Sequence, residues 1–297
     1  SRFALDPFSL DSIEGLAFAA LFDPTGAFTG STQIEFIDTF LIYNYPGTRF
    51  WGSSLSNVME FDGLYIAGKD GYPDPLVAMN VNRREILLFG ELKTEFWYNA
   101  GGAAYPFAVL PGAYIEHGCL APFSVAAYDM ETYWLAQDLA GNCMVLRVSG
   151  YDVTRISNHA LEYALQQMKI AGADLSDALG FVWQQNGHIF YSLNFISGNQ
   201  TWVFDSSLGG TPDLAWHQES WQNPMGGAER MRDGAMAFAY GQNLSLDHTT
   251  GDLYVLDQNL YVDQVAGTDC PIVCGKGFPH LVQGVSKVHG QPEPTDG

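Results

Sequence analysis

The chain has 297 residues, enough to bury one large core or two ordinary ones, and its 47% hydrophobic and 14% aromatic residues exclude a disordered protein. Charged residues make up only 15%, against an average of about 25%, which predicts that much of the surface is covered by partners. The net charge of −20 argues against a nucleic-acid-binding surface, because binding phosphates needs clustered Lys and Arg. The same charge suits a surface that nucleic acid passes without adsorbing, and equally an ordinary soluble or an acid-tolerant secreted protein.

The two ends of the chain differ in composition from its middle. Segment 1–33 opens with "SRFALDPFSL", which has no signal-peptide hydrophobic region, and we expect it to stand apart or to complete a blade. Segment 267–297 ends in "GQPEPTDG", so we expect a partly disordered C-terminal extension. No apolar run approaches the ~20 residues of a membrane helix, so no membrane insertion is expected.

Between residues 34 and 266 the sequence alternates strand-like runs with turn residues. Five units are recognisable, and Asn186-Gly187 is the strongest hairpin signal because both residues tolerate positive φ. Sheets of this size cannot bury both faces alone, whereas a radial stack of them can. The sequence therefore predicts an all-β fold, a β-propeller-like ring of antiparallel blades over 34–266. The first turn of each unit is predicted at Asp38, Asn82-Arg83, Asp129-Met130, Asn186-Gly187 and Gly241-Gln242.

One segment breaks the β pattern and predicts an inserted α-helix at about 157–172. Ser157 or Asn158 can cap its start, and Gly172 ends it. Two roles stay open, a helix packed on a propeller face and a contact between subunits. Its apolar face is formed by Ala160, Leu161, Ala164, Leu165 and Met168.

Candidate catalytic and metal-binding residues are weakly supported. A nucleophilic Cys119 would need a base such as His117, but nucleophiles of this kind open a helix and the sequence after Cys119 continues as a strand. We interpret "IEHGC" as a tight turn in which Gly118 relieves backbone strain. Cys270 and Cys274, with His280 nearby, fit a metal site, a local disulfide or free thiols.

Acidic and aromatic residues leave a glycan-related function open. The acids fall mainly in turns, where they cap backbone groups, although paired glycosidase acids remain an alternative. The seven tryptophans either pack between sheets or form a platform for carbohydrate. The turn acids are Asp38, Asp62, Asp70, Asp74, Asp129, Asp138 and Asp252, and the tryptophans are Trp51, Trp97, Trp134, Trp183, Trp202, Trp216 and Trp221.

Three strings, "LFGELKTEFWYN", "IEHGC" and "RISNHALE", resemble the packaged-DNA stabilisation proteins of short-tailed bacteriophages, which are tail accessory or tail hub proteins. The resemblance runs in order from about Asp38 to about Asp257, and beyond that it is confined to the surroundings of "FPHLVQG". It assigns structural roles to Phe89, Gly90, Glu91, Thr94, Glu95, Trp97, Tyr98, Glu116, His117, Gly118, Cys119, Arg155, Ser157, His159, Trp202, Trp216 and His217.

The resemblance implies a non-enzymatic virion protein without a cofactor, metal or catalytic residue. Such a protein joins the tail below the portal and its adaptor protein, extends the tail tube and helps retain packaged DNA. It implies a hexameric ring that carries a tail needle or plug and tailspikes or tail fibres, with DNA passing through the lumen without specific binding. Assembly is expected in the host cytoplasm. The alternative is a β-propeller that binds carbohydrate or hydrolyses glycans.

Overall fold

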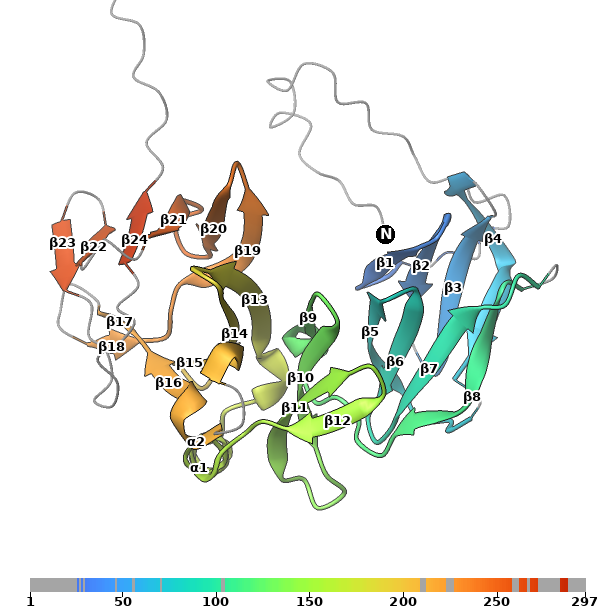
Figure 1. Ribbon diagram of the computed structural model, residues 1–297, viewed down its shortest axis with the longest axis horizontal. Helices are drawn as coiled ribbons and strands as arrows, with labels where there is room; N and C mark the ends of the chain where they lie inside the picture. Colours follow the sequence, from blue (N-terminus) through green and yellow to red (C-terminus); the bar gives the residue numbers. More distant parts are fainter. Residues whose placement is uncertain are drawn as a thin grey trace, which may run out of the picture. The chain divides into compact units, whose positions relative to one another are not determined.

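The computed structural model describes residues 26, 28, 30–45, 47–54, 57–69, 71–102, 105–208, 212–222, 227–257, 262–265, 268–271 and 284–287. Antiparallel four-stranded sheets dominate this part of the chain (Figure 1). The predicted all-β, propeller-like fold is confirmed. The chain divides into two compact units, residues 1–119 and 120–297.

In the described part of the first unit, the strands form two blade-like sheets and follow chain order in each. The first sheet consists of β1 (Ile34–Ile37), β2 (Phe40–Asn44), β3 (Arg49–Ser54) and β4 (Asn57–Gly68). The second consists of β5 (Leu76–Asn82), β6 (Glu85–Gly90), β7 (Thr94–Asn99) and β8 (Phe107–Ile115).

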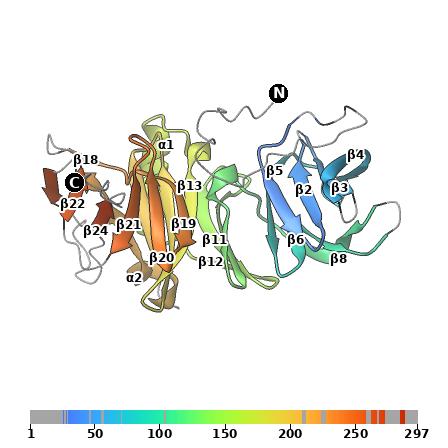
Figure 2. The ribbon, with the colours of Figure 1, turned by 90° about the horizontal axis from the view of Figure 1, so that it is seen from above.

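Among the described residues of the second unit there are three four-stranded sheets, which follow one another in Figure 2. The third sheet of the chain has β9 (Ala126–Tyr128), β10 (Glu131–Gln137), β11 (Cys143–Ser149) and β12 (Asp152–Arg155). The fourth has β13 (Leu179–Gln185), β14 (His188–Phe195), β15 (Gln200–Asp205) and β16 (Trp216–Glu219). The fifth has β19 (Asp233–Ala239), β20 (Gln242–Asp247), β21 (Leu253–Asp257) and β24 (Gly284–Lys287).

Two short ribbons accompany these sheets. They pair β17 (Trp221–Gln222) with β18 (Ala228–Glu229), and β22 (Val262–Val265) with β23 (Thr268–Pro271). Segment 267–297, which the sequence marked as an extension, supplies β24 as the fourth strand of the fifth sheet. Most of segment 1–33 lies outside the described residues.

Every four-stranded sheet opens with a two-residue hairpin whose first residue has positive φ. Three of these turns lie where the sequence predicts them, at Asp38, Asp129 and Asn186. The second turn lies one residue later, at Arg83-Arg84, and the fifth one residue earlier, at Tyr240-Gly241. Arg and Tyr show no preference for left-handed backbone, so the turn signals of the sequence missed these two positions.

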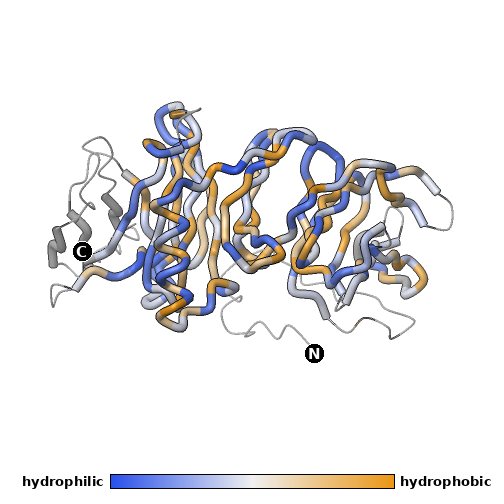
Figure 3. Tube along the Cα trace, turned by 90° about the horizontal axis from the view of Figure 1, so that it is seen from below, coloured by the Kyte–Doolittle hydropathy of each residue, from blue (hydrophilic) through white to orange (hydrophobic). Residues whose placement is uncertain are grey.

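Neighbouring sheets within a unit are joined by shared apolar clusters. In the first unit, Phe50 of β3 meets Trp97 of β7 edge-on, with ring centroids 5.3 Å apart. In the second, Tyr133 of β10 stacks on Tyr191 of β14 at 5.0 Å. Figure 3 shows hydrophobic positions recurring along the chain among hydrophilic ones. Each sheet thus buries the face that it cannot cover alone.

Helix α1 (His159–Ile170) follows β12 and packs on the core of the second unit. The Asn158 side chain caps it by accepting a hydrogen bond from the Leu161 amide at 2.8 Å. Leu161, Leu165 and Met168 are buried, whereas Ala160 is exposed, so the apolar face is narrower than predicted. A second, one-turn helix, α2 (Pro212–Ala215), precedes β16.

Candidate functional site

Two of the motif strings converge in the first unit on a buried group of charges, Lys69, Asp74 and Glu95, here called the Lys69 cluster. Lys69 and Asp74 lie in the linker between β4 and β5, and Glu95 lies on β7. Their side chains are 0%, 6% and 3% exposed. Lys69 Nζ contacts Asp74 Oδ1 directly and lies 4.0 Å from Glu95 Oε1.

Fixed donors surround both carboxylates. Asp74 Oδ2 accepts the backbone N–H of Leu92 at 2.7 Å and that of Lys93 at 3.2 Å. Glu95 Oε1 accepts the Tyr72 amide at 2.6 Å, and its Oε2 accepts Trp97 Nε1–H at 3.1 Å. Buried charge is costly unless it is paired and hydrogen-bonded, so breaking these contacts would be unfavourable. They therefore hold the β4–β5 linker against the β6–β7 hairpin.

Two motif glycines allow the backbone to close around this cluster. A Cβ on Gly90 would lie 2.3 Å from Asp74 Oδ2, and a Cβ on Gly118 would lie 2.3 Å from the carbonyl group of Glu91. The Cys119 amide donates to the Gly90 carbonyl at 2.8 Å. Gly118 does not have positive φ, so the interpretation that it relieves backbone strain is wrong. Glycine is needed there because two backbone segments approach closely.

His117 and Cys119 connect the segment after β8 to β6 and β7 through hydrogen bonds of their backbone. The Thr94 hydroxyl donates to the His117 carbonyl at 2.9 Å, which ties the exit of β8 to the start of β7. The Cys119 side chain is 1% exposed, which denies a substrate access to a nucleophile at this position.

The remaining motif residues of this region lie on β6 and β7 and directly after β6 and β8. Phe89 is in the core, and the amide of exposed Glu91 donates to the Pro75 carbonyl at 3.1 Å. Tyr98 is exposed. Glu116 pairs with Lys93 Nζ at 2.9 Å, and this hydrogen bond raises the pKa of Lys93.

The string "RISNHALE" organises the start of helix α1 in the second unit. Arg155 Nε donates to Glu162 Oε1 at 2.7 Å, and the Ser157 hydroxyl donates to the same oxygen at 2.6 Å. His159 is exposed at the first helical position. Trp216 Nε1–H donates to the Ile156 carbonyl at 2.7 Å, so β16 holds the same turn.

Two further motif residues lie elsewhere on the fourth sheet. Half-buried Trp202 donates from Nε1 to Gln200 Oε1 at 3.0 Å. His217 Nε2 lies 3.3 Å from Glu219 Oε1. The motif residues described by the structure therefore form separate structural junctions, each inside its own unit.

Capping of the local turn explains some of the predicted acids, whereas Asp74 accepts the backbone amides of a different turn, between β6 and β7. Asp138 caps its own loop, accepting the amides of Ala140 at 2.9 Å and Asn142 at 2.8 Å. Asp38 accepts Asn99 Nδ2–H at 2.8 Å and pairs with Arg84, and the bond to Asn99 is the main cause that lowers its pKa. Asp74 instead belongs to the buried cluster. The side chains of Asp62 and Asp70 lie outside the described residues.

The tryptophans offer no exposed platform for carbohydrate. Trp202 is half-buried, and the other six are each 5% exposed or less. This burial argues against the glycan-binding alternative, because sugar recognition by stacking needs an accessible ring face.

Within the ranges that the structure describes, no three His, Cys, Asp or Glu side chains gather as metal ligands do. Cys274 and His280 lie outside these ranges, as does the side chain of Cys270. No described helix has the length and apolarity of a membrane span.

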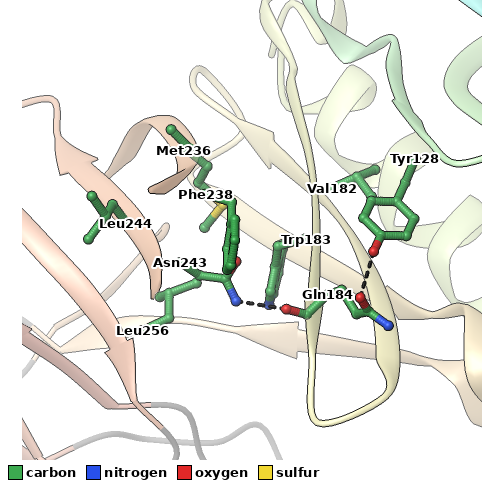
Figure 4. Close-up of a pocket in the computed structure, with 10 residues that line it drawn as sticks. Tyr128, Val182, Trp183, Gln184, Met236, Phe238, Asn243, Leu244 and Leu256 are labelled. Atoms are coloured by element: carbon green, nitrogen blue, oxygen red, sulfur yellow. Dashed lines mark hydrogen bonds between the residues drawn. The ribbon is translucent and has the colours of Figure 1, made fainter. Parts of the chain in front are cut away.

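A small cavity of about 240 Å³ lies between the fourth and fifth sheets (Figure 4). Asn243 Nδ2 donates to the Gln184 carbonyl at 2.8 Å, and the Tyr128 hydroxyl donates to Gln184 Oε1 at 2.6 Å. Its lining contains no carboxylate, histidine, cysteine or lysine, so it lacks the groups of a hydrolytic site. The lining residues are Tyr128, Val182, Trp183, Gln184, Met236, Ala237, Phe238, Asn243, Leu244 and Leu256.

Comparison with known proteins identifies the family. The family described as bacteriophage P22 Gp10, beta-propeller, matches residues 25–261. No curated protein matches the chain. Among solved structures, the chain is similar to PorZ, a bacterial surface component of the type-IX secretion system of Porphyromonas gingivalis, with 10% identity and a TM-score of 0.28. That match covers 75% of this chain but only 31% of the PorZ chain, and so weak a likeness carries no argument. The match over residues 25–261 shows that the chain belongs to the P22 Gp10 family of phage stabilisation β-propeller proteins.

Proposed function

We propose that this chain is a structural subunit of a phage tail hub, which closes or extends the DNA exit channel below the portal and stabilises packaged DNA. The single observation that carries the proposal is the family match over residues 25–261. The geometry supports it, because the motif residues of the chain hold blades and linkers together rather than line a reactive cleft.

In this proposal the subunit acts through its surfaces. It joins a hexameric ring, contacts the portal-adaptor protein above, and carries a tail needle or plug and tailspikes or tail fibres. The low charged fraction of 15% supports extensive subunit contacts, since charged residues are depleted at the centres of interfaces. The protein assembles in the host cytoplasm and resides in the virion tail.

The proposal is tested by removing the protein from assembling particles. Particles made without it are expected to package DNA and then lose it, so that the DNA becomes sensitive to nuclease and infectivity falls. Supplying the intact chain from a plasmid is the matched control and restores retention. Particles that keep their DNA and infect normally without the protein would refute the proposal.

A further inference from the structure

The Lys69 cluster brings an amine and a carboxyl group together in a setting built for their condensation. We propose that Lys69 and Asp74 form an intramolecular isopeptide bond spontaneously, with Glu95 carrying the proton. The inference is independent of the tail function, and a single bond formed once per chain needs no enzymatic turnover.

The reacting groups are held against each other and away from water. Lys69 Nζ contacts Asp74 Oδ1, and the two side chains are 0% and 6% exposed. The Tyr72 carbonyl accepts a hydrogen bond from Lys69 Nζ at 2.8 Å and fixes the direction of the amine. Positioning of this kind makes a slow bimolecular reaction effectively unimolecular.

The second Asp74 oxygen occupies a ready-made oxyanion site. Leu92 N–H and Lys93 N–H point at Oδ2 from 2.7 Å and 3.2 Å, and both belong to the β6–β7 turn. Two fixed backbone donors stabilise the negative charge that develops on this oxygen when nitrogen attacks Cγ. Gly90 leaves the space that Asp74 fills, since any Cβ there would overlap Oδ2.

Glu95 is the second carboxylate close to the amine. Its Oε1 lies 4.0 Å from Lys69 Nζ, and its two oxygens are held by the Tyr72 amide and Trp97 Nε1–H. A buried carboxylate so oriented can accept a proton from nitrogen and return it to the departing oxygen, which is general acid–base catalysis.

The atoms balance without an oxidant or a further reactant. The Lys69 ammonium first passes one proton to Asp74 Oδ1, leaving a neutral amine and a carboxylic acid. Nζ then bonds to Cγ, and the C=O electron pair moves onto Oδ2. Glu95 takes a proton from nitrogen and delivers it to the Oδ1 hydroxyl, the Cγ–Oδ1 bond breaks, and water leaves as the carbonyl re-forms. Glu95 ends as the carboxylate that it was.

Burial favours the product. An ion pair inside a protein bears a large desolvation cost, whereas the neutral amide bears little, and excluded water cannot hydrolyse it readily. The amide oxygen keeps the two hydrogen bonds that Asp74 Oδ2 accepts from Leu92 and Lys93.

Mass spectrometry of the purified full-length chain decides the question. The intact chain is expected to weigh one water, about 18 Da, less than its sequence requires. Trypsin should fail to cut after Lys69 and release Phe50 to Arg83 as one peptide that lacks the same mass, without backbone fragments separating Lys69 from Asp74. A folded wild-type chain of full mass that is cut after Lys69 would overturn the proposal, whatever the variants do.

Three variants test the role of each side chain in forming the bond. Lys69→Arg and Asp74→Ala should both show the full sequence mass. Glu95→Gln keeps the side-chain shape but cannot accept the proton, so bond formation should slow by about 100-fold or more. Bond formation at the wild-type rate in Glu95→Gln would refute the role of Glu95.

A succinimide at Asp70-Gly71 would remove the same mass and must be distinguished. It would persist in Lys69→Arg, open with hydroxylamine, and leave the wild-type chain cleavable after Lys69. Mass loss with these three properties would count against the isopeptide bond.

Discussion

Gly118 shows how one motif residue can be required for packing alone. An added methyl would lie 2.3 Å from the Glu91 backbone, and backbone cannot move aside as a flexible side chain can. We predict that Gly118→Ala lowers the free energy of unfolding by about 2–3 kcal/mol or prevents folding. The control is Gly52→Ala, whose methyl meets only the Phe107 ring at 3.4 Å. Urea unfolding measures both, and equal losses would contradict the close-approach argument.

Glu35 on β1 has a pKa of about 7, raised by burial and opposed by a hydrogen bond with Asn80. The unfolded chain ionises this carboxyl near its ordinary pKa of 4.5, whereas the folded chain keeps it protonated until about 7. The contribution of Glu35 to the free energy of unfolding is therefore full below pH 4.5, and it declines as the pH rises to about 7.

Glu35→Gln should remove that decline. The variant is expected to be more stable than wild type by about 1–2 kcal/mol at pH 8, after allowance for partial solvent screening, and equal to it at pH 4. Urea unfolding of both chains at the two pH values makes the comparison, because other titrating groups cancel in the difference. A gap that does not change with pH would show that Glu35 is not desolvated as described.

At the scale of elements, helix α1 depends on its cap. Asn158→Ala removes the acceptor for the Leu161 amide and should cost about 1 kcal/mol of unfolding free energy. Asn158→Asp is the matched control, because a carboxylate caps equally well while losing the bond from Asn158 Nδ2 to the Pro212 carbonyl. Thermal melting compares the three chains. Equal losses in the two variants would assign the effect to the Pro212 contact instead.

The elements were predictable where residue type and backbone conformation agree. Asn186-Gly187 marks its hairpin because both residues favour left-handed backbone, and "HALEYALQQM" shows the spacing of an amphipathic helix. Arg83-Arg84 and Tyr240-Gly241 adopt the same turn because their strands pair in that register, which no local signal reveals.

The Lys69 cluster was not predictable from local pattern for a related reason. Lys69 and Asp74 flank glycine and proline in a loop-like string, where charges are normally solvated. Their burial follows from partners at Leu92, Lys93 and Glu95, about 20 residues on, and only the folded chain brings these together. Sequence resemblance marked Gly90, Glu95 and Gly118 as a set without giving the reason.

At the scale of the whole molecule, the charge of −20 should prevent adsorption of DNA. We predict no retention of duplex DNA by the purified protein even at about 50 mM salt, where electrostatic binding is strong. A filter-binding or gel-shift assay measures this, with a basic protein of similar size as the positive control. Retention that disappears as salt is raised would reveal a cationic surface and contradict the proposed passive channel wall.

Composition alone did not lead to a function. A charge of −20 and a low charged fraction fit secreted and glycan-binding proteins as well as a tail hub. The ordered motif strings narrowed the choice, and the match over residues 25–261 established the family. Blade-like sheets by themselves would not have done so, because one fold serves many functions.

The connection between the first two sheets also has an order in time. Lys69 and Asp74 leave the ribosome before Leu92, Lys93 and Glu95, so their charges stay hydrated until the hairpin of β6 and β7 has been made. A nascent chain that stops before Leu92 therefore lacks the hydrogen-bond donors of Asp74. The contact between the β4–β5 linker and the β6–β7 hairpin forms only when the C-terminal partner has been made. The linker after the first sheet is therefore fixed to the second sheet only once β6 and β7 of that sheet have been synthesised.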